Sequence, residues 1–166
     1  ITTYVFKQPS RLQVEELDYY RNNRYTKAFT EVIAKKAPFC KAGDVFCNLV
    51  PFWQLELYFG KTLGLTPRLS ADGHSGFYPD LYEFLKVEPD QPNPGTQQTE
   101  FPYAASHVGK KDLTHFFEQW GFFREVNTIV DDYGKEQMTV TKQRADAVKG
   151  RIKNLHLPDM KDIALP

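Results

Sequence analysis

Four histidines are the side chains of this sequence that could bind a metal ion or transfer a proton: His74, His107, His115 and His156. A zinc-binding helix of the H-E-x-x-H type carries two histidines one turn apart, and that pattern does not occur in the 166 residues. His107 and His115 are eight residues apart but fall on different predicted helices, and a zinc site needs a third ligand. We therefore predict no metal site and no catalytic residue in this chain.

Motifs for other kinds of catalysis are also missing from the sequence. It contains no G-x-S-x-G motif, no phosphate-binding loop and no dinucleotide-binding fingerprint. Glu56 and Glu83 could serve as acids, and Asp80 could cap a helix. Because the chain has 21 acidic residues, such pairs are expected by chance and do not predict an acid–base site.

Aromatic side chains remain as candidates for contact with a ligand. The aromatic residues within 52–59 could stack on a sugar or a peptide, but their helical spacing favours a place in the core. His74, Tyr78 and Tyr82 lie beside a glycine-rich stretch. We predict that these three residues line the wall of a substrate cleft.

The overall composition limits the classes of partner. Lys plus Arg equals Asp plus Glu, at 21 each, so the chain has no net charge that would attract nucleic acid or an anionic membrane surface. No apolar run approaches the roughly 20 residues that span a bilayer. We expect no nucleic acid partner and no membrane span.

The two cysteines, Cys40 and Cys47, are too few for a zinc site or a disulfide scaffold. A bridge between them is possible, but Cys47 lies in an apolar helical run and is expected to be a small core residue. The sequence leaves open whether the two cysteines pair.

Apolar periodicity predicts a mainly α-helical fold, a bundle of about five to seven helices with one small β-hairpin near the C-terminus. Residues 25–33 place their apolar side chains on one helical face, and Leu113, Phe116, Phe117 and Trp120 form a second stripe. β-Branched residues flank a turn at 131–134, which predicts a hairpin over about 126–141. The predicted helices cover the end of a helix at 1–7, then 25–36, 44–59, 77–85, 99–108, 112–120 and 142–153.

Particular residues are expected to begin or end these helices. Asp44 is a plausible N-cap, Pro51 should kink the following helix or mark its first turn, and Thr141 should cap the last helix. Gly121 is expected at a helix C-terminus. The remaining stretches, 60–76 and 88–95, are rich in glycine and proline and are predicted to be loops, and one domain is sufficient for residues 1–166.

Three stretches together resemble the C-terminal part of enhancin-like zinc metallopeptidases: DVFCNLVPFWQLELYF at 44–59, GFYPDLYE at 76–83 and DLTHFFEQWGF at 112–122. The later DDYG at 131–134, followed by MTVT at 138–141, is similar to the same family. The likeness covers most of residues 1–153, and its most specific part is Val-Pro-Phe-Trp-Gln-Leu.

The resemblance implies zinc-dependent cleavage of heavily O-glycosylated proteins such as mucins. In that family, two histidines of H-E-x-x-H and a downstream glutamate hold the zinc, and the glutamate between the histidines activates a water molecule. None of these residues lies in this chain, and residues 1–5 are similar to the stretch that follows the downstream glutamate. We therefore expect the catalytic helices immediately upstream of Ile1.

Two interpretations follow. In the first, the chain is the helical C-terminal subdomain of a secreted or cell-surface bacterial metallopeptidase, supports the zinc helices and forms one wall of the cleft for a glycoprotein substrate. In the second, it is a non-catalytic helical module that binds glycan or protein partners. The first implies zinc in the parent protein and no cofactor in this chain.

Overall fold

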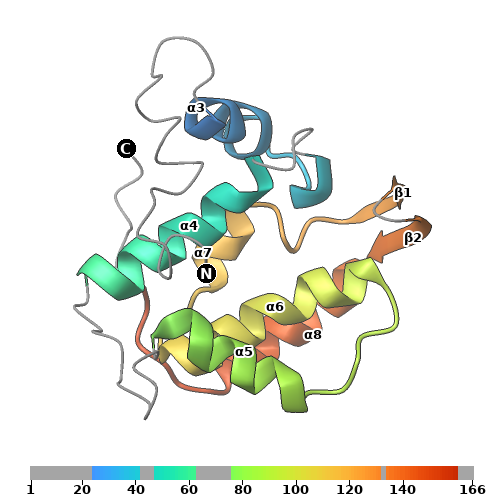
Figure 1. The fold of residues 1–166 in the computed structure, drawn as a ribbon. Helices are drawn as coiled ribbons and strands as arrows, with labels where there is room; N and C mark the ends of the chain where they lie inside the picture. Colours follow the sequence, from blue (N-terminus) through green and yellow to red (C-terminus); the bar gives the residue numbers. More distant parts are fainter. Residues whose placement is uncertain (1–23, 42–46, 63–75, 132–133, 161–166) are drawn as a thin grey trace.

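The computed structural model describes residues 24–41, 47–62, 76–131 and 134–160, and confirms a mainly helical fold with one hairpin (Figure 1). Its α-helices are α3 (Arg24–Ala28), α4 (Val50–Glu56), α5 (Phe77–Val87), α6 (Pro94–Gly109), α7 (Thr114–Gln119) and α8 (Lys142–Lys153). Two π-helical segments are η1 (Phe29–Ala34) and η4 (Leu57–Thr62), and two 3-10 segments are η2 (Phe39–Lys41) and η3 (Cys47–Leu49). The strands are β1 (Val126–Asp131) and β2 (Lys135–Val140).

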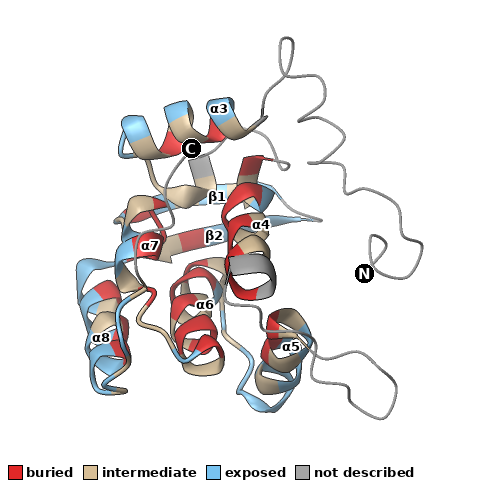
Figure 2. Cartoon of the chain, turned by 90° about the vertical axis from the view of Figure 1, so that its left-hand side faces the viewer, coloured by how far each residue is buried: buried red, intermediate tan, exposed pale blue. Residues whose placement is uncertain are grey.

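The helices are stacked in tiers. Helices α5, α6 and α8 lie side by side at the bottom of the molecule, α4 and α7 lie above them, and α3 lies at the top (Figure 1). The sides that face inward between these tiers carry most of the buried residues (Figure 2). The predicted helical bundle is therefore present, and α6 is its central lower helix because it contacts both α5 and α8.

Helix α4 begins later than the sequence suggested. The predicted helix started at residue 44, whereas the α-helix begins at Val50 and a 3-10 turn, η3, precedes it. Pro51 lies in the first turn of α4, where a missing backbone N–H costs nothing, so it marks the start of the helix and not a kink. The chain then continues from α4 through the π-helical turn η4 to Thr62, where a loop was predicted.

Helix α6 begins earlier than predicted. We expected a loop to Gly95, but Asn93 caps the helix and Pro94 occupies its first turn. The Asn93 side chain accepts a hydrogen bond from the Thr96 backbone N–H at 3.0 Å, and the Thr96 hydroxyl accepts one from the Asn93 N–H at 3.2 Å. This reciprocal capping box satisfies two backbone donors, which starts the helix five residues before Thr99.

The remaining predicted helices are present where they were expected, although the one at 25–36 is an α-helix only to Ala28 and continues to Ala34 as the π-helical segment η1. Gly121 has φ +77°, as expected of a helix C-terminal glycine, and the Thr141 hydroxyl accepts a hydrogen bond from the Arg144 N–H at 3.2 Å. The stripe of Leu113, Phe116, Phe117 and Trp120 is buried. In α8, Ala145, Val148 and Ile152 point inward and are at most 2% exposed. Cys47 is a buried core residue, as expected.

The hairpin is attached to the helices by backbone packing. Strands β1 and β2 pair antiparallel, with Val126 opposite Val140. A Cβ atom placed on Gly95, in the first turn of α6, would lie 2.1 Å from the carbonyl oxygen of Thr139 in β2. A glycine is therefore required where α6 crosses the hairpin, and the hairpin has a fixed position on the bundle.

Some expectations fall outside the described residues: the helix end at 1–7, the cap at Asp44 and most of the loop at 60–76. Within the described ranges, no helix combines the length and the hydropathy that crossing a membrane requires.

The contact between α6 and β2 predicts a large effect of one methyl group. We expect Gly95→Ala to lower the free energy of unfolding by about 1–3 kcal/mol, because the added Cβ overlaps the backbone of Thr139. Urea unfolding followed by circular dichroism would measure it.

Gly150→Ala is the matched control, because a Cβ added there, on the exposed side of α8, would meet no atom within 4 Å. It should raise the stability by roughly 0.5–1 kcal/mol, since alanine is the better helix former. Equal effects of the two substitutions would contradict this account of the contact.

Candidate functional site

The segments that carry the family resemblance meet at α4. Gln54, buried in α4, accepts a hydrogen bond at 2.9 Å from the indole N–H of Trp120, which follows α7. Tyr78, in the first turn of α5, donates its hydroxyl to the backbone carbonyl of Phe52 at 2.5 Å. Two side-chain hydrogen bonds thus join stretches that are 26 and 66 residues apart in the sequence.

Around this junction the aromatic rings form a continuous packed cluster. The ring of Phe52 packs edge-on against Phe101 of α6, at 5.1 Å between centroids, and against Phe39, at 6.0 Å. Phe39 stacks on Phe122 at 4.2 Å. Phe52 is used for packing, as expected for the aromatics within 52–59, although Phe39, Phe52 and Phe101 are only half-buried.

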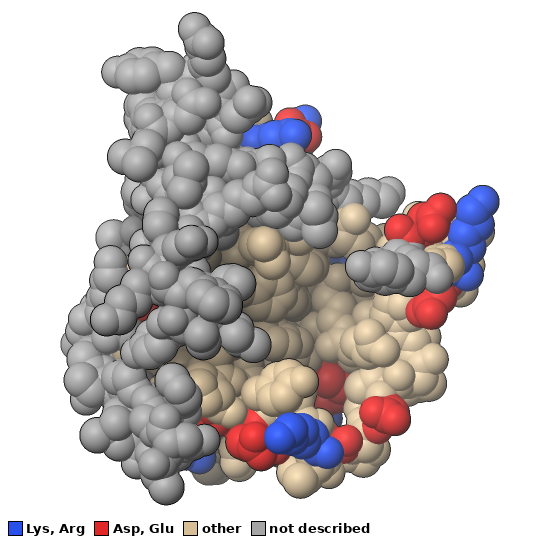
Figure 3. Space-filling model, viewed as in Figure 1, with Lys and Arg blue, Asp and Glu red and all other residues tan. Residues whose placement is uncertain are grey.

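The face beside this cluster is hollowed. Figure 3 shows the hollow between α4 above and α5 and α6 below, with the hairpin at one side. The described atoms inside it belong mostly to uncharged residues, whereas Lys, Arg, Asp and Glu gather on its rim. A concave face with an uncharged interior and a charged rim is a form that ligand sites can have.

The three predicted cleft residues have different surroundings. His74 lies outside the described residues. Tyr78 is half-buried and held against α4 by its hydroxyl, whereas Tyr82, one turn further along α5, is 68% exposed. The ammonium group of Lys86 lies 5.6 Å from the centre of the Tyr82 ring and binds Glu83 at 2.8 Å. A role of these residues in substrate binding stays a prediction.

Glu56 is a residue of this site that the sequence did not distinguish from other acids. It lies in the last turn of α4, one turn beyond Phe52, and it is half-buried. Burial raises the pKa of its carboxyl above the ordinary value of 4.5. Burial, and then the charge of Glu56, also raise the pKa of the Tyr78 hydroxyl, so this phenol stays a neutral donor over the ordinary pH range.

The outer side of α4 carries an apolar stripe. Trp53 lies in α4, and Leu49 and Leu57 lie at its two caps, each four residues from Trp53 and with helical backbone angles. Leu49 is 44% exposed and the other two are half-buried. Side chains at this spacing lie on one side of a helix, so they form a continuous strip, called here the α4 stripe. Glu56 lies between the α4 stripe and Phe52 around the helix.

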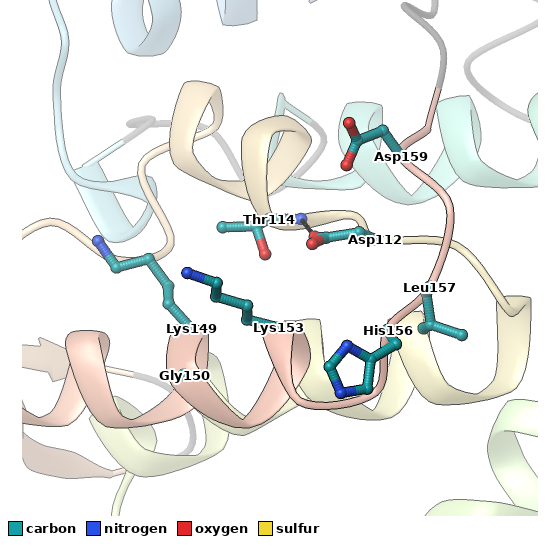
Figure 4. Close-up of a pocket in the computed structure, with 8 residues that line it drawn as sticks. All are labelled: Asp112, Thr114, Lys149, Gly150, Lys153, His156, Leu157 and Asp159. Atoms are coloured by element: carbon teal, nitrogen blue, oxygen red, sulfur yellow. Dashed lines mark hydrogen bonds between the residues drawn. The ribbon is translucent and has the colours of Figure 1, made fainter.

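A second hollow, of about 650 Å³, lies where α8 ends (Figure 4). The side chains of Thr114 and Lys153 point into it, and Asp112 accepts a hydrogen bond from the Thr114 backbone N–H at 2.8 Å. Lys149 is paired with Glu118 at 3.2 Å. Acidic and basic groups are mixed here, so their charges largely offset one another, and the hollow is a weak candidate for a ligand site.

The histidines of the described part do not assemble. His107 of α6 stacks on Phe84 at 4.9 Å, and His115 of α7 lies 3.1 Å from the Gln119 amide. Within the ranges that the structure describes, no three His, Cys, Asp or Glu side chains could hold a metal ion together. The described residues therefore do not fit a zinc site.

Comparison with protein-family models gives a match over residues 8–121 to peptidase M60, enhancin and enhancin-like. This range includes the stretches 44–59 and 76–83 and nearly all of 112–122. The chain belongs to the peptidase M60 family. The hairpin and α8 lie beyond the matched range. Helix α8 nevertheless shares the main core with it, since Ala145, Val148 and Ile152 pack in the same cluster as Trp120, whereas Val126, Met138 and Val140 of the hairpin form a second, smaller cluster.

Solved structures support the fold of this M60 chain. A metallopeptidase in complex with Tn antigen matches with a TM-score of 0.68 and 23% identity, over 84% of this chain and 26% of its own. A metallopeptidase from Bacteroides thetaiotaomicron matches with a TM-score of 0.68 and 24% identity, over 92% and 26%. A protein of unknown function from Bacillus anthracis str. Ames matches with a TM-score of 0.61 and 22% identity, over 96% and 25%.

The chain therefore spans about a quarter of the length of the solved structures that it matches. At these identities the likeness concerns the fold. No curated protein matches the chain.

The junction at α4 predicts energetic coupling between Gln54 and Trp120. Gln54→Leu should cost about 1–3 kcal/mol of stability, because it leaves the buried indole N–H without an acceptor. Trp120→Phe should be costly too, but the double variant should lose less than the sum of the two, since neither buried polar group then remains unpaired. Denaturant unfolding of the four proteins measures the coupling; strict additivity would contradict it.

The raised pKa of Glu56 predicts that the stability of the protein depends on pH. Because burial raises the pKa of Glu56 in the folded state, ionisation of this carboxyl destabilises the fold. The free energy of unfolding is therefore unaffected by Glu56 below about pH 4.5 and falls as the pH rises through the folded-state pKa. Glu56→Gln should therefore stabilise the protein at neutral pH, and the gain should vanish below about pH 4. Glu83→Gln, which removes an exposed ion pair with Lys86, should show no such gain at neutral pH.

Proposed function

We propose that this chain is the scaffold and one wall of the substrate cleft of a bacterial zinc metallopeptidase that acts on O-glycosylated, mucin-like proteins. On this proposal the parent protein is secreted or lies at the cell surface, and the chain alone is inactive. Membership of the M60 family supports the peptidase context. The structure in complex with Tn antigen, a fold relative, supports a glycoprotein as the substrate.

The observation that carries the scaffold role is the α4 stripe. The opposite side of α4 is buried within the chain, where Gln54 binds Trp120. Leu49 and Trp53 leave apolar surface on the outer side. A partly exposed apolar strip on the central helix is characteristic of a surface that another part of a protein covers. We assign that cover to the catalytic part of the same polypeptide, because the solved relatives are about four times as long as this chain.

The zinc ligands would then come from that other part. H-E-x-x-H is missing from this sequence, and the described residues offer no group of three ligands. On this proposal Tyr78 and Tyr82 of α5 belong to the wall of the cleft and contact the substrate.

The chain alone and the complete polypeptide that carries it are expected to differ in metal content. We expect about one zinc per complete polypeptide, a typical catalytic site, and no stoichiometric zinc in the chain alone. Metal analysis by plasma mass spectrometry, with cleavage of an O-glycosylated protein as the activity assay, tests both parts of the proposal. Stoichiometric zinc in the chain alone would refute it.

Leu49→Glu in the complete polypeptide tests the α4 stripe. The position is partly exposed, so the substitution should disturb α4 little, but it should lower peptidase activity and the midpoint of thermal unfolding by placing a charge in the contact with the catalytic part. Ile129→Glu is the matched control, since Ile129 is 63% exposed on the hairpin, away from α4. Equal behaviour of the two variants would argue against docking at the stripe.

The alternative is a non-catalytic helical module that binds glycan or protein partners. The exposed Tyr82 favours it, because an exposed ring can stack on a sugar. The genomic sequence upstream of Ile1 separates the two: H-E-x-x-H followed by a glutamate supports the peptidase, and an unrelated domain supports the module. A glycan array on the chain is a second test, and uniform background binding would speak against the module.

A further inference from the structure

We draw no further inference here: the strongest candidate, the surface of α5 on which the apolar side chains of Tyr82, Leu85 and Val87 are exposed, carries none because nothing in the structure shows what covers it.

Discussion

The buried hydrogen bond between Gln54 and Trp120 is the constraint on which the arrangement of this molecule depends. Both side chains lie in the core, where an indole N–H without an acceptor would be costly. Because the two groups must meet, α4 is fixed against the end of α7. Apolar contacts alone would tolerate small rotations of α4, whereas a directional bond allows one orientation.

That orientation decides what α4 presents on its other sides. With Gln54 and Leu55 directed into the core, Phe52 faces α6 and its carbonyl is available to Tyr78 of α5. The α4 stripe is left on the outside. One helix thus supplies part of the core, the attachment of α5 and the exposed apolar strip, because its apolar residues extend over more than one side.

The lower tier stabilises this arrangement by different means. Glu100 of α6, 18% exposed, binds Arg144 and Arg151 of α8, each at 2.7 Å, and the Arg151 guanidinium lies 3.9 Å from the centre of the Tyr103 ring. Charge and stacking thus join α8 to α6 at the surface, while α8 buries its apolar side in the core below Trp120. The family match ends at residue 121, yet the core continues into α8, so the matched region is not a complete structural unit.

Local sequence patterns determined the helices, the hairpin and the residues that α7 and α8 bury, because periodicity and caps act between residues three or four positions apart. The start of α4 was predicted too early, although the sequence marks Pro51 as a possible first turn, and the start of α6 was predicted too late because apolar periodicity does not register the capping pair of Asn93 and Thr96. The sequence also carried the family resemblance, and with it the proposed role.

Tertiary structure alone decided which polar and aromatic groups became internal links. Tyr78 and Tyr82 are equivalent in the sequence pattern of α5, yet one is held by a carbonyl of α4 and the other faces solvent. Glu56 was one acid among 21 until its place on α4 was known. The physical reason is that burial and hydrogen bonding are set by partners 26 or 66 residues away, and no local pattern contains that information.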